Sequence, residues 1–285
     1  MVKGVYYIDI SSANEESRYK PEVSGQLFNF YNGFDVSGVD SIQRVFHNSY
    51  RSIIARDAND EVVGAIRASF DGVYAMIWDL QVSRVTNQNH HKLKGDLLSA
   101  MVNELKTKGH NFIAAIVPGE EVSFYQAFGL LYGDNLTVTT IDPEKHILWE
   151  SVHPVRQNDR VNPSEVSRLF TVTGWQEEAA MGEKFANAFN TALCNFTARN
   201  EHDNLIGIVR THFDGKVAMK WNLVVHPDYR KQGVGFKLLS HLLDFIISGG
   251  YESYAFSANH MVSHYQKIGI IPAHDKHLVT NNPNL

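Results

Sequence analysis

Fourteen residues, HPDYRKQGVGFKLL from His226 to Leu239, have the composition of a phosphate-binding turn. Gly233 and Gly235 stand between an apolar strand-like run and an apolar helix-like run. Glycine adopts positive φ easily and leaves no Cβ in the path of a ligand. Successive backbone N–H groups, together with the N-terminus of the following helix, would then favour a pyrophosphate. Arg230 and Lys231 add positive charge beside it.

The spacing excludes two familiar nucleotide motifs. The Gly-Lys-Ser/Thr ending of a P-loop is missing, and so is the third glycine of a dinucleotide-binding turn. A helix start that uses glycine only for packing is the competing explanation, and a lone Gly-x-Gly does not decide between the two.

The strands that precede this turn occur twice in the chain. ARDANDEVVGAIRASFDGVYAMIWDLQV (55–82) aligns without a gap to ARNEHDNLIGIVRTHFDGKVAMKWNLVV (198–225), and FYQAFGL (124–130) matches HYQKIGI (264–270). Self-similarity of this kind indicates a repeated fold. We therefore predict a first unit over residues 1–145, a linker over 146–160 and a second unit over 161–285.

The pattern of each unit predicts an α+β fold. In the second copy, a helix starts at Asn162-Pro163-Ser164, another covers about 177–190, and Asp214-Gly215 is a hairpin signal between two strands. VAMKWNLVVH alternates with period two, whereas FKLLSHLLDFIISGG has helical spacing and a glycine stop. The predicted order is ααβββαβαβ, with a mixed, mostly antiparallel sheet flanked by helices.

Three motifs in order resemble a known family. Arg-x-x-Gly-x-Gly is preceded by LVVHPDY, is followed by KLL, and precedes HYQKIGI by about thirty residues. This arrangement is similar to the GCN5-related N-acetyltransferases, called GNAT, over about residues 160–272. Because the unit occurs twice, the chain resembles a tandem GNAT protein. Ile270 stands where the family usually has an aromatic residue.

The resemblance implies a role for each matching residue, with acetyl-CoA as co-substrate and no metal. The backbone of Leu223 and Val225 would hold the pantetheine arm and polarise the acetyl carbonyl, Asn259 would contact the cofactor, and Tyr265 would protonate the leaving thiolate. The pyrophosphate loop would comprise Arg230, Lys231, Gln232, Gly233, Val234 and Gly235.

The expected activity is transfer of an acetyl group to a primary amine of a small molecule. Trp175 and Trp221, with the first unit, would line the acceptor pocket. The general base stays open between helix glutamates and water. Two alternatives also stay open: transfer of a longer acyl group or to a protein amine, and an acyl-CoA sensor without turnover.

The first copy lacks the glycine turn. Lys92 and Lys94 stand where Gly233 and Gly235 stand in the second copy, and Asn89 replaces Arg230. A lysine brings a Cβ and resists positive φ. We expect this copy to be structural; the alternative is that its lysines, with His90 and His91, bind another anion.

The composition of the chain argues against several other classes of protein. A net charge of -5 argues against a nucleic-acid binder held by phosphate neutralisation. There is no apolar run long enough to span a membrane and no secretory signal, so we expect a cytoplasmic protein, monomeric or homodimeric. Cys194 is the single cysteine and is expected to be buried rather than nucleophilic. His260 and His264, spaced as i and i+4, leave zinc as a minor alternative.

Overall fold

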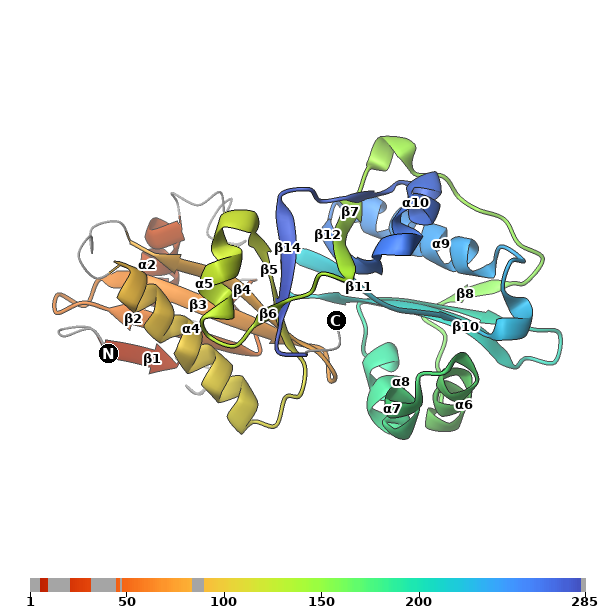
Figure 1. Cartoon of the computed structure of the whole chain (residues 1–285), viewed down its shortest axis with the longest axis horizontal. Helices are drawn as coiled ribbons and strands as arrows, with labels where there is room; N and C mark the ends of the chain where they lie inside the picture. The colour runs from red at the N-terminus through yellow and green to blue at the C-terminus, as the bar shows by residue number, and fades with distance from the viewer. Residues whose placement is uncertain (1–5, 10–20, 32–44, 47, 84–89, 283–285) are drawn as a thin grey trace.

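The computed structural model describes residues 6–9, 21–31, 45–46, 48–83 and 90–282, which form two seven-stranded sheets side by side (Figure 1). The first sheet has the order β1 (Tyr6–Asp9), β2 (Arg51–Arg56), β3 (Val62–Phe70), β4 (Ala75–Val82), β5 (Ile113–Pro118), β14 (Lys276–Thr280) and β6 (Leu131–Tyr132). The second has the order β13 (Ile270–Pro272), β7 (Leu136–Ile141), β12 (Glu252–Ala258), β11 (Val217–Val225), β10 (Leu205–Phe213), β9 (Cys194–Arg199) and β8 (Val155–Gln157).

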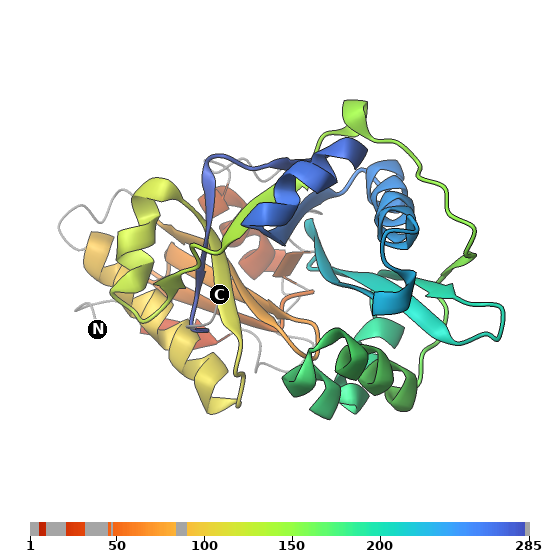
Figure 2. The same ribbon diagram turned by 45° about the vertical axis from the view of Figure 1, so that its right-hand side comes forward.

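Helices cover the sheets. The first unit has α2 (Pro21–Tyr31), α4 (His90–Thr107), η2 (Gly119–Glu121) and α5 (Val122–Gln126), and η3 (Pro143–Lys145) follows β7. The second unit has α6 (Pro163–Thr173), α7 (Gln176–Ala180) and α8 (Gly182–Asn190) on one face of its sheet, and α9 (Val234–Ser248) and α10 (Val262–Tyr265) on the other (Figures 1 and 2). The remaining short turns are η4 (Pro227–Tyr229), η5 (Asn259–Met261) and η6 (Gln266–Ile268). The predicted α+β class is confirmed. No helix in the described ranges combines the length and the apolar composition that a bilayer crossing requires.

Local signals set the helix ends in the second unit. The Asn162 side chain accepts a hydrogen bond from the Glu165 N–H at 3.0 Å, and the Glu165 carboxylate accepts one from the Asn162 N–H at 3.1 Å. This capping box starts α6 at the predicted position. The predicted helix over 177–190 is instead two helices that meet at Met181. At Gly182 α8 approaches α6 so closely that an added Cβ would lie 2.0 Å from the Ser167 Oγ.

The predicted Asp-Gly hairpin is present in both copies. Asp71 Oδ1 accepts hydrogen bonds from the N–H groups of Val73 and Tyr74 at 2.8 and 2.6 Å. Asp214 Oδ1 accepts the equivalent pair from residues 216 and 217 at 2.8 and 2.6 Å. Each aspartate therefore closes the turn between the two longest strands of its unit.

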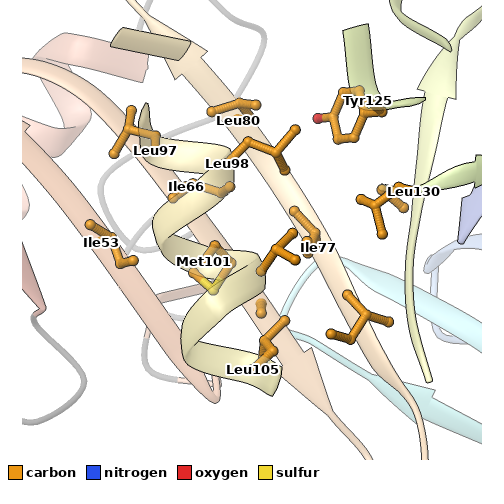
Figure 3. Packing of buried hydrophobic residues seen from close by; sticks show 14 of the residues in the cluster. Ile53, Ile66, Ile77, Leu80, Leu97, Leu98, Met101, Leu105, Tyr125 and Leu130 are labelled. Atoms are coloured by element: carbon orange, nitrogen blue, oxygen red, sulfur yellow. The ribbon is translucent and has the colours of Figure 1, made fainter. Parts of the chain in front are cut away.

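One helix packs on each sheet in the same way. An added Cβ on Gly64 would lie 2.8 Å from Leu97 Cδ1, and one on Gly207 would lie 2.9 Å from Leu238 Cδ1. These glycines let α4 and α9 approach the third strand of their units. Figure 3 shows the resulting core of the first unit, in which four buried side chains of α4 face β2, β3 and β4: Leu97, Leu98, Met101 and Leu105.

The two units exchange a strand. β7 comes from the first copy but pairs with β12 and β13, whereas β14 ends the second copy but lies between β5 and β6 (Figure 1). The register joins Ala255 to Thr139 in one sheet and Leu278 to Ile116 in the other. Neither sheet is complete without a strand from the other copy. The boundaries at 1–145 and 161–285 follow the repeat along the sequence, while each sheet draws on both segments.

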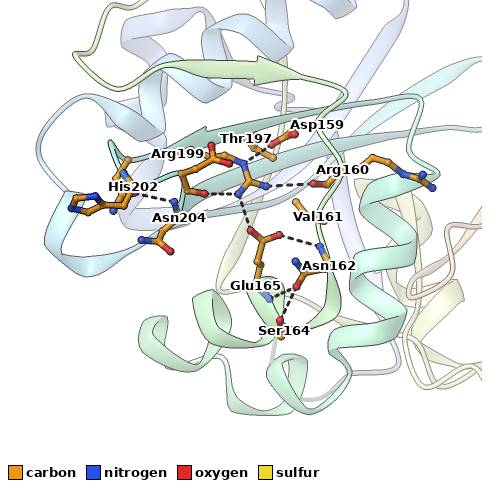
Figure 4. Close-up of polar contacts among 12 residues, drawn as sticks. Asp159, Arg160, Val161, Asn162, Ser164, Glu165, Thr197, Arg199, His202 and Asn204 are labelled. Carbon is orange, nitrogen blue, oxygen red and sulfur yellow. Dashed lines mark hydrogen bonds and ion pairs between the residues drawn. The ribbon is translucent and has the colours of Figure 1, made fainter.

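The linker is fastened to the second sheet by a buried arginine (Figure 4). Arg199 donates to Asp159 of the linker at 2.7 Å and to Glu165 of α6 at 2.7 Å. Asp159 also accepts from the Thr197 hydroxyl at 2.7 Å. This network joins the linker, β9 and the start of α6 into one rigid corner.

A buried interface holds the units together. Its apolar part comprises Met76, Trp78, Ala114, Val138, Val217, Met219, Trp221 and Leu278. Its charged part is two ion pairs between the copies: Arg67 with Asp214 and Arg210 with Asp71, each at 2.8 Å. These residues are equivalent in the repeat, so the interface has an approximate two-fold relation.

Candidate functional site: the end of β11 and the start of α9

The turn between β11 and α9 has the backbone of an anion cradle. Lys231 and Gly233 have positive φ values of 61° and 80°. The first helical hydrogen bond runs from the Lys237 N–H to the Gly233 carbonyl at 2.9 Å. The N–H groups of residues 234–236 at the start of a helix have no intrahelical acceptor. They point out of the helix N-terminus, where the dipole favours negative charge.

The two glycines of this turn have different surroundings. A Cβ on Gly233 would lie 3.0 Å from the Trp149 Nε1 and 3.2 Å from the Glu150 carbonyl oxygen. A Cβ on Gly235 would meet only Val225 Cγ2, at 3.5 Å. Gly233 therefore makes room for the linker, and Gly235 is the position that keeps the space beside the end of β11 clear.

The linker supports the turn from behind. The Trp149 N–H donates to Ser240 Oγ at 3.0 Å, and the Ser151 hydroxyl donates to the Gln232 carbonyl at 3.0 Å. The Lys237 ammonium donates to the Ser151 carbonyl at 3.0 Å. These bonds hold the turn in one conformation before any ligand binds. The predicted loop side chains Arg230, Lys231 and Gln232 are all exposed.

The strands beside the turn diverge. β11 pairs in parallel with β12 only over Val217–Met219 and Glu252–Tyr254, although the strands continue to Val225 and Ala258. A bulge interrupts the pairing of β11 with β10 near Asn222, whose φ is 53°. Bulges bend a strand and increase its local twist. The two strands are therefore unpaired with each other beyond Met219 and Tyr254, which leaves a gap in the sheet beside the end of β11, the strand that leads into α9.

The backbone of Val225 faces this gap. The next residue, His226, donates its N–H to the Ile206 carbonyl at 2.8 Å, and Val225 lies opposite Gly207. In an antiparallel pair the N–H groups of adjacent residues point to opposite sides of the strand. The Val225 N–H therefore points away from β10 and toward the gap. The Val225 carbonyl accepts a hydrogen bond from Arg230 Nε at 3.2 Å.

Tyr265 and Asn259 lie on the far side of the gap. Tyr265, on α10, packs against the same buried cluster as Leu223 and Val225. Burial raises its pKa, so the phenol is protonated at neutral pH. The Asn259 side chain donates to the Asp134 carbonyl at 2.8 Å and accepts from the Thr137 hydroxyl at 2.7 Å. The side chain of Asn259 is thus bonded to the segment that leads into the exchanged strand β7.

The two tryptophans that were predicted to line the acceptor pocket lie in different places. Trp175, at the start of α7, packs on Phe170 with ring centroids 5.5 Å apart. Trp221 is buried at the interface and stacks on Tyr74 of the first unit at 4.5 Å.

Tyr74 was not identified from the sequence, because Val217 is its counterpart in the repeat and a single tyrosine in a turn carries no signal. Its hydroxyl accepts a hydrogen bond from the Asn222 side chain at 3.0 Å, and burial raises its pKa to about 12. The first unit therefore places a protonated phenol against the bulge of β11.

The first copy has helix where the second has the glycine turn. α4 already begins at His90, so Lys92 and Lys94 are helical, whereas α9 begins only at Val234. Lys94 forms an ion pair with Glu121 of η2, and Lys92 lies 3.3 Å from Asp96. Each lysine therefore already has an acidic partner, which argues against the alternative that the two lysines bind an anion. Asn89 lies outside the described residues.

Two further candidates from the sequence were the Cys194 thiol and a histidine metal site. Cys194 is fully buried in β9, and burial raises its pKa to about 11. This environment makes a poor nucleophile. Within the described part of the chain, no three His, Cys, Asp or Glu side chains are grouped to hold a metal ion.

Comparison with known proteins finds a family match within the second unit. Residues 162–270 match the family described as Acetyltransferase (GNAT) family. An uncharacterised N-acetyltransferase, ycf52, from Gracilaria tenuistipitata var. liui is 33% identical over 89 residues, which are 30% of this chain and 48% of that protein. The ycf52 protein of Pyropia yezoensis is 25% identical over 117 residues, 40% of this chain and 67% of its own. The chain thus spans only about half the length of the first of these relatives.

Solved structures agree on the fold of the whole chain. A tandem GNAT protein from the clavulanic acid biosynthesis pathway superposes with a TM-score of 0.58 at 14% identity, covering 97% of both chains. A GCN5-related N-acetyltransferase from Sphaerobacter thermophilus gives a TM-score of 0.59 at 10% identity, covering 96% of this chain and 95% of the other. The chain therefore has the fold of two GNAT-type units in tandem, and residues 162–270 of its second unit are similar to the acetyltransferase (GNAT) family.

Proposed function

We propose that the second unit transfers an acetyl group from acetyl-CoA to a primary amine of a small molecule. The observation that carries this proposal is the contrast between the copies. Among the described residues, the second copy has a turn with positive φ at Lys231 and Gly233 before α9, whereas the first copy is helical from His90 on. The residues fit the co-substrate, since a Cβ at Gly235 would fill the space beside Val225.

The binding roles follow from the geometry. The N–H groups of residues 234–236 would donate hydrogen bonds to the diphosphate, with Arg230 and Lys231 nearby as exposed cations. The pantetheine arm would lie in the gap between β11 and β12, next to the backbone of Leu223 and Val225. Asn259 would shape the wall of this gap, because its side chain and its backbone N–H are already bonded to residues 134, 135 and 137.

Acetyl-CoA supplies an activated thioester. The amine nitrogen attacks the carbonyl carbon, the carbon–sulfur bond breaks, and the amine loses a proton to water or a nearby base. The Val225 N–H would stabilise negative charge that develops on the carbonyl oxygen. Tyr265, kept protonated by its raised pKa, would donate to the departing thiolate. These roles are assigned to groups of the protein and use no metal ligand.

The acceptor would approach from the face covered by α6–α8. Trp175 on α7 and Tyr74 from the first unit contact the same apolar cluster there. Glu178, on α7, is a helix glutamate that could attract a cationic amine. The first unit would thus help to form the acceptor pocket without binding acetyl-CoA.

The proposal is tested by binding stoichiometry and then by turnover. Calorimetry of the full chain with acetyl-CoA should give one site, whose affinity Gly235→Lys should lower. A panel of small amines and acyl-CoAs, read by mass spectrometry, should then give an acetylated amine. Two sites per chain would contradict the assignment to the second unit. Binding without acylation of any amine would instead support a sensor, and preference for longer acyl groups would support the other alternative.

A further inference from the structure

The first unit retains a cavity in its own gap between diverging strands. β4 and β5 pair only over Ala75–Ile77 and Ile113–Ala115, and then separate. A cavity of about 310 Å³ occupies the space, and residues of the second unit form part of its wall. Its walls include apolar and aromatic side chains from both units: Ile77, Leu80, Val117, Tyr125, Val217 and Tyr254.

This cavity is closed at the end where a cofactor would enter. Lys94 from α4 and Glu121 from η2 form their ion pair across it. The equivalent positions in the second copy hold Gly235 and Met261, which form no such bridge. The first cavity therefore suits a small ligand rather than a long nucleotide thioester.

A comparison of the copies shows one surplus negative charge beside the cavity. Arg67 Nε lies 2.5 Å from Asp79 Oδ2, and Arg67 Nη2 lies 2.8 Å from Asp214 Oδ2. One cation thus serves two carboxylates. In the second copy Arg210 contacts Asp71 and the neutral Asn222, at 2.8 and 3.0 Å. The difference arises because Asp79 stands where the repeat has asparagine.

The other charged side chains at the cavity already form pairs. Lys94 pairs with Glu121, Lys216 with Glu252 at 3.7 Å, and Lys276 with Asp275 at 3.1 Å. The surplus therefore resides on the group around Arg67. Arg67 and Asp214 are 0% and 1% exposed, but the Asp79 side chain is 27% exposed and lines the cavity. Asp79 is where a ligand would meet this charge.

We propose that this cavity binds the primary ammonium group of a small molecule, with Asp79 as its counter-ion. A charge that leaves water needs a partner of opposite sign, and Asp79 supplies it. The faces of aromatic side chains such as Tyr254 attract cations, and the apolar walls accommodate a short alkyl chain. An anionic ligand would instead have to compete with the acidic partners of Lys94, Lys216 and Lys276. The site is separate from the acetyl-transfer gap, and it goes beyond the proposed activity.

The test uses the full chain and four simple probes at equal ionic strength: n-butylammonium, n-butanol, butyrate and K⁺. Calorimetry or ligand-observed NMR should detect butylammonium binding in preference to the other three. Asp79→Asn should weaken it at least about tenfold, because the variant keeps the hydrogen bond to Arg67, as Asn222 does with Arg210, but loses the charge. Glu144→Gln removes an exposed charge outside the cavity and should change nothing.

A second variant guards against a folding artefact. Ile116→Phe should block the cavity sterically without altering any charge, and thermal unfolding of each variant shows whether the fold survives. Equal binding of butyrate or K⁺, or unchanged butylammonium affinity in Asp79→Asn, would overturn the proposal. Neither measurement involves acetyl-CoA, so the result is independent of the activity proposed for the second unit.

Discussion

Arg210 of β10 lies 2.8 Å from Asp71 in the β3–β4 turn of the other unit, and both side chains are almost completely buried. The repeat places Arg67 in the same relation to Asp214. Each copy therefore donates one cation and one anion to the interface, which fixes how the two sheets face each other. The arrangement is reciprocal, like that of an isologous dimer, although a single chain forms it.

The two ion pairs should differ in strength. Asp71→Asn leaves Arg210 with only neutral Asn222, so we expect the free energy of unfolding to fall by about 3–5 kcal/mol. Asp214→Asn leaves Arg67 paired with Asp79, so we expect a smaller loss of about 1–3 kcal/mol. Urea unfolding measures both, with Glu144→Gln as an exposed control. Equal losses would refute this explanation of the asymmetry.

The exchanged strands should make the units mutually dependent. Fragments 1–150 and 151–285, expressed separately, should each lack a cooperative unfolding transition, because each then leaves strand edges exposed in its sheet. Co-expressed, they should copurify as one complex through β7 and β14. Size-exclusion chromatography with circular dichroism tests both outcomes. A stable, monomeric 151–285 fragment would show that the exchange is dispensable.

The two glycines of the turn should respond differently to lysine. Gly235→Lys projects beside Val225 and should weaken acetyl-CoA binding with little effect on thermal unfolding; such overlap costs about 1–3 kcal/mol. That penalty is about 5- to 150-fold in affinity. Gly233→Lys would also displace Trp149 and so should lower the unfolding temperature as well. Calorimetry and thermal scans separate the effects, and identical behaviour of the two variants would contradict their distinct surroundings.

Tyr265→Phe should reduce kcat far more than it changes acetyl-CoA affinity. Loss of general acid assistance lowers rates by about 10²–10⁴-fold, and we expect the lower end because substrate positioning remains. Tyr125→Phe is a matched control, since it alters the equivalent tyrosine of the first unit. Steady-state kinetics decide the matter. An unimpaired Tyr265→Phe enzyme would remove the phenol from the mechanism.

Lys220 should make stability depend on pH. Its side chain is buried and donates to Ser253 Oγ at 2.9 Å, and burial lowers its pKa to about 7 from an ordinary 10.5. Folding therefore opposes protonation of Lys220. The free energy of folding that is lost by burying the charged amine is largest below pH 7, decreases as the pH rises toward 10.5 and is absent above that pH.

Lys220→Met should accordingly stabilise the fold at pH 6, by an amount on the order of a few kcal/mol, and by less at pH 9. Urea unfolding at both pH values measures the difference between variant and wild type. A difference that does not change with pH would mean that the buried amine is not the cause.

The sequence by itself determined the features that depend on neighbours along the chain. The repeat, the Asp-Gly hairpins, the helix start at Asn162 and the glycine turn after β11 were all readable, because a few adjacent residues set each backbone conformation. The same local reasoning indicated that Lys92 and Lys94 exclude the glycine turn from the first copy. The structure adds the reason, which is that α4 begins at His90 and continues through both lysines.

Only the tertiary structure decided which distant segments meet. Nothing local distinguishes β7 from β14 as partners for one sheet or the other, because strand pairing is settled by the packing of both sheets together. Contact of Trp149 with Gly233 and of Tyr74 with Trp221 likewise joins residues remote in sequence. Asp79 differs from Asn222 by one atom type, and its charge matters only because folding brings it to Arg67 and, through Arg67, to Asp214.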